Sequence, residues 1–208
     1  MKLDLATLVA DFAAGLKRAD AKRPQAVNVR TKKPFQPGIG PHSEAKTVEL
    51  ALGELAESRP DHYAGFETGV PYFEFPRQRC DVCLGEPPDW DWAIEVKMLR
   101  FLGDNGKPND NILMHVLSPY PQHRSALTDC GKLARASLGE RKAILIYGFD
   151  HDEWPLDPAI EAFELLAGRK VQLGLRESAM FLDLVHPVHA NGRVFGWEIG
   201  AEPVLRIA

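Results

Sequence analysis

The stretch RCDVCLGEPPDWDWAIEVKML, residues 79–99, decides how the fold of this chain is interpreted. Two apolar runs, RQRCDVCL and DWAIEVKMLRF, flank a Gly/Pro-rich turn, and this arrangement predicts a β-hairpin. The second run carries Glu95 and Lys97 among apolar residues. Because a buried charge without a partner costs several kcal/mol, these two side chains require a specific explanation.

Side chains on a strand alternate between its two faces. This alternation places Ala93, Glu95, Lys97 and Leu99 on one face and Trp92, Ile94, Val96 and Met98 on the other. On the preceding strand, Asp81 shares a face with Cys83, and pairing through the turn brings Asp81 next to Glu95. The hairpin therefore predicts that two carboxylates and one ammonium group converge.

Two neighbouring carboxylates repel each other unless a cation lies between them. Mg²⁺ prefers oxygen ligands and usually retains several waters, so a site with two carboxylates suits it. A lysine beside the metal can orient a bound water and stabilise charge that develops on a phosphate. These are the requirements of phosphodiester hydrolysis. The alternative is an ion network on a solvated sheet face, which is the better interpretation of an isolated E-x-K tripeptide.

An aspartate on one strand, a turn, and E-x-K on the next strand together resemble the PD-(D/E)xK nuclease superfamily, which has the restriction-endonuclease-like fold. The matching residues are Asp81, Glu95 and Lys97, and the order of elements is similar over roughly residues 41–150. Cys80 stands where the family pattern has proline. The resemblance implies a metal-dependent nuclease that acts on DNA, with Mg²⁺ or Mn²⁺ held by Asp81 and Glu95. Lys97 would position the attacking water, and the product would carry a 5′-phosphate.

The helix before the hairpin usually contributes a further carboxylate in this superfamily. Here PHSEAKTVELALGELAES, residues 41–58, predicts such a helix with Ser43 as its N-cap. Glu44 shares a helical face with Val48 and is the preferred candidate. Glu49 is the second candidate for the metal site, although an ordinary surface glutamate is the more frequent role of such a residue.

A second helix is predicted within HRSALTDCGKLARASLG, residues 123–139, ending at its final glycine. Asp129 and Lys132 are three residues apart and form either an intrahelical ion pair or, for Lys132, a contact with a substrate phosphate. The preceding segment SPYPQHR supplies candidate substrate-wall residues, which are Tyr120, His123 and Arg124.

Positive charge is concentrated near the N-terminus, although the net charge of the chain is −4. Residues 17–33 contain seven Lys and Arg and one Asp, a local charge of +6, so the remainder carries −10. Within this basic arm, Arg30, Lys32 and Lys33 are candidates to contact a nucleic-acid backbone. A solvated linker kept soluble by its lysines is an equally good interpretation.

The order of elements predicts a mixed α/β fold: a mixed central sheet flanked by helices, in one domain spanning residues 1–208. The nuclease-like core covers about residues 41–150. An N-terminal helix and the basic arm occupy residues 1–40, and residues 151–208 add a helix and two strands. The pair Asn191-Gly192 predicts a tight hairpin turn between those two strands.

Composition limits the location and the alternatives. No apolar run is long enough to cross a membrane, so no membrane partner is expected. Three cysteines do not make a disulfide framework, which favours the cytoplasm. The spacing of Cys80 and Cys83 is zinc-like, but strand alternation puts them on opposite faces, while metal binding by His186 and His189 is a minority interpretation.

Substrate choice stays open at this level, both between DNA and RNA and between internal and terminal cleavage. No separate recognition domain is evident, so a homodimer or a protein partner would supply specificity. A non-catalytic nucleic-acid-binding or assembly module that keeps the nuclease fold is the alternative function.

Overall fold

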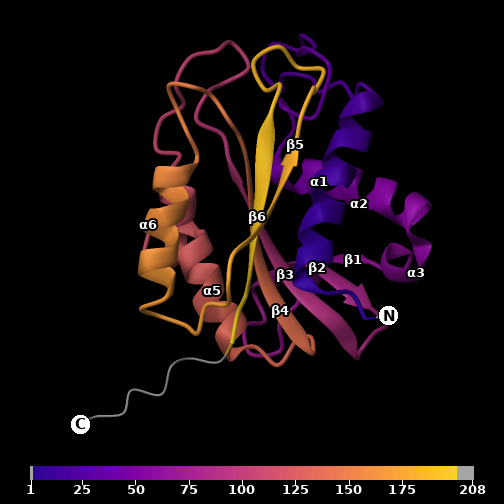
Figure 1. Ribbon diagram of the computed structural model, residues 1–208, viewed down its shortest axis with the longest axis vertical. Helices are drawn as coiled ribbons and strands as arrows, with labels where there is room; N and C mark the ends of the chain where they lie inside the picture. Colours follow the sequence, from indigo (N-terminus) through magenta and orange to yellow (C-terminus); the bar gives the residue numbers. More distant parts are fainter. Residues whose placement is uncertain (1, 201–208) are drawn as a thin grey trace.

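A mixed six-stranded sheet forms the centre of the molecule in a computed structural model that describes residues 2–200 (Figure 1). Its strands are β1 (Glu67–Pro71), β2 (Arg79–Gly85), β3 (Trp90–Leu99), β4 (Arg141–Phe149), β5 (Glu177–Phe181) and β6 (Gly192–Glu198). Their order across the sheet is β1-β2-β3-β4-β6-β5, and among these neighbours only β3 and β4 run parallel. The predicted hairpin is β2–β3, and the two C-terminal strands extend the same sheet. The last eight residues of the predicted domain, 201–208, lie outside the described residues.

Helices cover both faces of the sheet (Figure 1). One face carries α1 (Leu5–Ala21), α2 (Glu44–Ser58) and α3 (Pro60–Tyr63), and the other carries α4 (Met114–Leu117), α5 (Ala126–Arg135) and α6 (Asp157–Ala167). A short 3-10 helix, η1 (Pro121–His123), precedes α5. The predicted mixed α/β architecture with flanking helices is therefore confirmed. No helix within residues 2–200 is both long enough and apolar enough to span a membrane.

Side-chain alternation on β3 separates two apolar cores. Trp92, Ile94 and Val96 pack with α1 and α2, whereas Ala93 and Leu99 pack with α5 and α6. Glu95 and Lys97 alternate in the same way as Ala93 and Leu99, so their side chains also point towards α5. The prediction that Glu95 and Lys97 share a face rests on this alternation and is confirmed by their contacts with α5.

Strand β2 separates from β3 beyond the pair Val82–Ile94. Side chains replace the missing strand there: Asp81 Oδ2 accepts a hydrogen bond from the Val96 N–H at 2.9 Å, and Glu44 Oε2 accepts one from Met98 at 2.5 Å. Buried backbone N–H groups require partners, so these two carboxylates are fixed by the main chain of β3. The site forms at this separation.

Helix α2 begins as predicted, with Ser43 as its N-cap and its hydroxyl oxygen accepting from the Lys46 N–H. Its buried face includes Val48, Ala51 and Leu55. Glu44 is the first helical residue, where the positive end of the helix dipole favours a carboxylate. The N-cap therefore fixes where α2 presents Glu44 to β3.

The predicted tight turn at Asn191-Gly192 is wrong. Strands β5 and β6 do pair, but Phe181 is opposite Gly192, so residues 182–191 form a loop. Asp20 of α1 binds the Val185 N–H at 2.5 Å and holds this loop against the helix. A contact this distant in sequence overrides the local turn preference of Asn-Gly.

Three further predictions need correction. Helix α5 ends at Arg135, because Gly139 adopts a φ of 77° and lies against the main chain of Ala93 in the turn that leads into β4. Cys80 and Cys83 are both buried in the core on the α5 side, because regular pleating of β2 against β3 ends at Val82. The segment HYAGFETGVPYFEF, residues 62–75, is predicted from its composition to be strand-like with breaks at Gly69 and Pro71, but it contains the end of α3 and a five-residue strand, β1, that continues through Gly69 to Pro71.

Candidate active site

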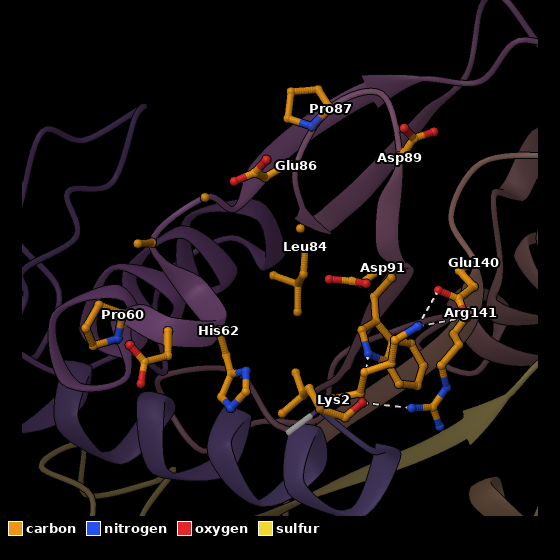
Figure 2. A pocket seen from close by; sticks show the side chains of 16 residues that line it. Lys2, Pro60, His62, Leu84, Glu86, Pro87, Asp89, Asp91, Glu140 and Arg141 are labelled. Atoms are coloured by element: carbon orange, nitrogen blue, oxygen red, sulfur yellow. Dashed lines mark hydrogen bonds and ion pairs between the residues drawn. The ribbon is translucent and has the colours of Figure 1, made fainter.

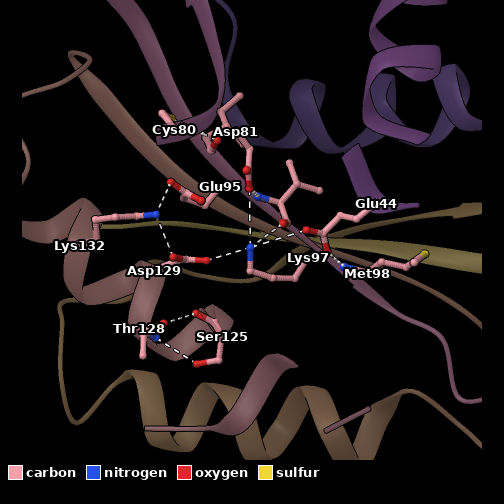
Figure 3. A network of polar contacts seen from close by, with 12 residues as sticks. Glu44, Cys80, Asp81, Glu95, Lys97, Met98, Ser125, Thr128, Asp129 and Lys132 are labelled. Carbon is pink, nitrogen blue, oxygen red and sulfur yellow. Dashed lines mark hydrogen bonds and ion pairs between the residues drawn. The ribbon is translucent and has the colours of Figure 1, made fainter. Parts of the chain in front are cut away.

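Six charged side chains converge where β2 separates from β3 (Figure 3). They are Asp81 from β2, Glu95 and Lys97 from β3, Glu44 from α2, and Asp129 and Lys132 from α5. We call this set the carboxylate–lysine cluster. It brings together five residues predicted from the sequence, and four separate elements hold them in place.

Lys97 occupies the centre of the cluster. Its Nζ lies 2.9 Å from Asp129 Oδ2 and 3.7 Å from both Asp81 Oδ2 and Glu44 Oε1. It also donates a hydrogen bond to the carbonyl oxygen of Val96 at 3.0 Å. Four oxygens from four residues therefore face one point, which is the type of donor set that Mg²⁺ prefers.

Glu95 and Lys132 form the buried half of the cluster. Glu95 Oε1 accepts a hydrogen bond from the Tyr72 hydroxyl at 2.5 Å and lies 2.8 Å from Lys132 Nζ. Lys132 Nζ is also 2.9 Å from Asp129 Oδ1. Lys132 thus makes the predicted intrahelical pair and also faces Glu95, while its contact with a substrate phosphate stays a prediction.

Exposure of the carboxylates changes from one side of the cluster to the other. The side chains of Asp81 and Glu44 are 37% and 33% exposed, whereas that of Glu95 is 1% exposed. Solvent and any ligand therefore reach the cluster on the side of Asp81 and Glu44, and Glu95 closes it from within.

The charge of the cluster is suited to a divalent cation. Four carboxylates minus two ammonium groups leave an excess of −2. Asp129 Oδ2 is buried and is paired with Lys97 only as an ion pair, without hydrogen-bond geometry. Within residues 2–200, no three His, Cys, Asp or Glu side chains already form a complete metal-binding group. A cation would therefore have to take the place of the Lys97 ammonium among these oxygens.

Burial raises the pKa of Glu95 well above its ordinary value, and the nearby Asp129 and Asp81 carboxylates raise it further against the opposing effect of Lys132. Burial also raises the pKa of Glu44. Both carboxyl groups therefore gain from a nearby positive charge, which favours their ionised form.

Lys97 is held in its charged form. Burial alone would lower its pKa, but the carboxylates of Asp129, Glu44 and Asp81 outweigh burial and raise it. Lys132 has a raised pKa for the same reason, with Glu95 and Asp129 as its partners. Without a metal, the two lysines neutralise the cluster as far as their charges allow.

The structure places Glu49 outside the cluster. Its side chain is exposed and pairs with Lys46 one helical turn away, at 2.9 Å. Of the two glutamates considered for the helix contribution, only Glu44 contacts Lys97 and β3.

The predicted nucleic-acid contacts lie on exposed segments that lead into the cluster. Tyr120 and Arg124 are exposed in the segment before α5, next to η1. Arg30, Lys32 and Lys33 are exposed at the tip of the basic arm, and none of the three forms an ion pair with another described residue. The arm is closed by a bridge between Val27 and Pro34 and continues into the N-terminus of α2.

Sequence reasoning missed two members of the polar network. Asp129 was considered only as an ion-pair partner, although its spacing from Lys132 was the available signal. Tyr72 had no signal, because its contact with Glu95 depends on how the chain leaves β1.

A large cavity of about 870 Å³ lies elsewhere, at the amino ends of β3 and β4 (Figure 2). It is lined by residues such as Trp92 and Arg141 and shares no residue with the cluster. Its acidic residues are Asp61, Glu86, Asp89, Asp91 and Glu140. They outnumber Lys2 and Arg141, so this cavity is unsuited to phosphate.

No protein-family model, curated protein or solved structure matches this chain.

Proposed function

We propose that the chain is a metal-dependent nuclease of the PD-(D/E)xK type that hydrolyses phosphodiester bonds in DNA. The observation that carries the proposal is the convergence of the Asp81, Glu44 and Asp129 carboxylates on Lys97, on a side of the sheet that solvent reaches. Glu95 joins them through Lys132, and the six side chains together carry a formal excess charge of −2. The order of the hairpin, the flanking helices and β4 also supports a restriction-endonuclease-like core.

Asp81, Glu95 and Glu44 would hold Mg²⁺ or Mn²⁺, with Asp129 as a further oxygen donor beside them. The bound ion supplies a Lewis acid and lowers the pKa of a coordinated water. Asp81 and Glu44 are fixed by the N–H groups of β3, so their oxygens are positioned before a ligand arrives. Such preorganisation avoids a reorganisation cost during the reaction.

Lys97 would orient the attacking water and stabilise charge on the phosphate. The carboxylates of Asp129, Glu44 and Asp81 raise the pKa of Lys97, so Lys97 is a charged hydrogen-bond donor at this position. A cation that shared these carboxylates would lower that pKa, and Lys97 would donate a hydrogen bond to the water. Lys132 stays with Glu95 and opposes the burial that raises the pKa of that carboxyl group.

Substrate binding would use the exposed basic arm and the segment before α5. Arg30, Lys32 and Lys33 would contact the backbone, while Tyr120 and Arg124 would form one wall of the site. Specificity would come from a second copy of the chain or from another protein.

A non-catalytic nucleic-acid-binding module is the second candidate, and one observation favours it. Lys97 already fills the centre of the cluster and pairs with Asp129 at 2.9 Å, as in a closed structural ion network. In that case Lys97 would be needed for stability and not for any reaction.

The decisive test is cleavage of supercoiled and linear plasmid with Mg²⁺, Mn²⁺ or EDTA, comparing wild type with Lys97→Met and Asp81→Asn. Lys46→Met, on the exposed face of α2, is the matched control. The proposal expects metal-dependent cleavage by wild type and Lys46→Met that both cluster variants lose while still folded by circular dichroism. Cleavage that survives in either cluster variant would overturn this assignment of the site. Binding without cleavage by any of the proteins would favour the second candidate.

A further inference from the structure

A second group of potential ligands lies apart from the carboxylate–lysine cluster, in the loops at the upper end of the sheet (Figure 1). Asp104 lies in the loop after β3, His151 in the loop after β4, and His186 and His189 in the loop between β5 and β6. We call these four residues the histidine cluster. None of them has a role in the proposed nuclease reaction.

Two of these histidines point at one carboxylate oxygen without bonding to it. His189 Nε2 lies 3.4 Å from Asp104 Oδ1, and His186 Nε2 lies 3.9 Å from the same atom. Both histidine side chains are fully buried, and neither Nε2 nor Asp104 Oδ1 has a hydrogen-bond partner. Buried polar atoms are nearly always paired, so this arrangement indicates a missing partner.

The same lack of partners extends around His189. Both of its ring nitrogens are buried and unpaired, as is Nε2 of His151. The ring of His151 lies 5.8 Å from that of His189, centre to centre. Three side chains from three loops therefore present unsatisfied nitrogen or oxygen atoms to one region.

The separations suit ligands that share a metal ion. Ligand bonds of about 2.0–2.1 Å in a tetrahedral zinc site put neighbouring ligand atoms about 3.4 Å apart. The distance from His189 Nε2 to Asp104 Oδ1 has this value, and it is too long for a good hydrogen bond. The separation of the His151 and His189 rings is close to the roughly 5 Å expected for two imidazoles on one such ion.

We propose that His189, His151 and Asp104 bind a divalent transition-metal ion of the zinc class, at a site separate from the carboxylate–lysine cluster. Two imidazoles and one carboxylate form a donor set suited to such ions and unlike the all-oxygen set beside Lys97. Within residues 2–200 no three such side chains already form a complete metal-binding group, so binding would require the His151 side chain to move towards His189 and Asp104.

His186 has a positioning role rather than a ligand role. Its Nδ1 accepts a hydrogen bond from the Val188 N–H at 3.2 Å, so in the neutral ring Nε2 carries the proton. That N–H faces Asp104 Oδ1 at 3.9 Å, and it would orient the carboxylate if the two atoms approached when the metal binds.

The site would tie the end of the catalytic strand to the basic arm. Arg100 follows β3, lies 3.9 Å from Asp104, and donates a hydrogen bond to the Gly40 carbonyl oxygen. Gly40 packs so closely on His189 that a Cβ there would lie 2.5 Å from its ring. Metal binding at Asp104 and His189 would therefore fix the loop after Lys97 and the point where the arm enters α2.

The test is zinc binding by the full-length protein, with excess Mg²⁺ present to fill the catalytic cluster. Metal-free wild type is titrated with Zn²⁺ by calorimetry and with Co²⁺ by visible absorption. The proposal expects one ion per chain and a Co²⁺ spectrum of low coordination number. His189→Ala and Asp104→Asn should weaken binding by at least about 100-fold, and His186→Gln by about 10–100-fold with unchanged stoichiometry.

Two controls separate this site from others. His115→Ala changes an exposed histidine and should bind as wild type does. Asp81→Asn, in the carboxylate–lysine cluster, should also bind zinc as wild type does. The zinc proposal can therefore be tested even if the nuclease proposal fails. If His189→Ala does not fold, Asp104→Asn and the zinc-dependent rise in the Tm of wild type decide the question. No zinc binding by wild type, or binding that survives in the folded ligand variants, would overturn the proposal.

Discussion

Asp129 Oδ2 lies 2.9 Å from Lys97 Nζ, closer than the carboxylates of Asp81 and Glu44, which are both at 3.7 Å. The other oxygen of Asp129 pairs with Lys132, which in turn pairs with Glu95. Helix α5 therefore links Lys97 and Glu95 of β3, because Asp129 contacts Lys97 directly and reaches Glu95 through Lys132. In such a network, a change at one member alters the protonation of the others.

Asp129→Asn should lower the pKa of Lys97. The substitution keeps the size of the side chain and removes the carboxylate that contributes most to raising this pKa. The pKa can be followed in metal-free protein by carbon NMR of the lysine side chains. Glu49→Gln, which removes a carboxylate outside the cluster, is the control and should leave Lys97 unchanged. An unchanged Lys97 titration in Asp129→Asn would contradict the network.

Lys132→Met should destabilise the protein by about 3–5 kcal/mol, because it leaves the buried Glu95 without its cation. The double variant Lys132→Met/Glu95→Gln should recover most of this loss, since no charge is then left uncompensated. Urea denaturation of the two single variants and the double variant measures the coupling. Additive losses in the double variant would mean that the pair is not coupled.

Much of the cluster was predictable because it depends on strand periodicity. Alternation on β3 is local, so a shared face for Glu95 and Lys97 follows from spacing. The predicted pairing of Asp81 with Glu95 does not form, because the β2–β3 ladder ends at Val82–Ile94, and Asp81 joins the cluster through its side-chain bond to the Val96 N–H. Glu44 follows from the face of α2 that packs on the sheet. The family and the reaction are not tested by this geometry, and they stay predictions.

The features that were missed depend on contacts between distant parts of the chain. Asp129 joins the cluster only because α5 packs across the face of β3, and sequence spacing does not specify that packing. The loop between β5 and β6 replaces a tight turn because Asp20, 165 residues before Val185, binds its main chain. Local turn chemistry contains no information about such a partner.

Asp20→Ala should cost about 2–4 kcal/mol of unfolding free energy, because it leaves two backbone N–H groups without their acceptor. Asp20 is buried, and its oxygens accept from Ile39 N–H at 2.9 Å and from Val185 N–H at 2.5 Å. Thermal and urea unfolding measure the loss. The control, Asp183→Asn, removes an exposed negative charge in the same loop, keeps a residue type that tolerates the positive φ of this position, and should change stability by less than about 0.5 kcal/mol. Equal effects of the two substitutions would contradict an anchoring role for Asp20.

Replacing Lys32 and Lys33 by Gln should weaken DNA binding and reduce its salt dependence. If each lysine contacts one phosphate, the slope of log K against log salt concentration falls in magnitude by about 1.8. Fluorescence anisotropy at several salt concentrations, with EDTA to prevent cleavage, gives both quantities. The matched control replaces Arg169 and Lys170, which are exposed just after α6, and should leave the slope unchanged. An unchanged slope in the arm variant would favour the solvated-linker interpretation.

The stability of the metal-free protein should fall as the pH rises from 4.5 through the raised folded-state pKa values of Glu95 and Glu44. Glu95 and Glu44 have pKa values raised above the ordinary 4.5 in the folded state, so the folded protein binds their protons more tightly than the unfolded chain does. Their contribution is therefore complete below pH 4.5 and is lost as the pH rises through the folded-state pKa values.

Mg²⁺ should reverse the loss at the upper end of this range, by about 2.7 kcal/mol at about 100 times its Kd. Calorimetric unfolding with Mg²⁺ or EDTA tests both effects. Glu44→Gln should show a shallower pH dependence, and a Tm insensitive to both pH and Mg²⁺ would mean that these carboxyl groups do not form a cation site.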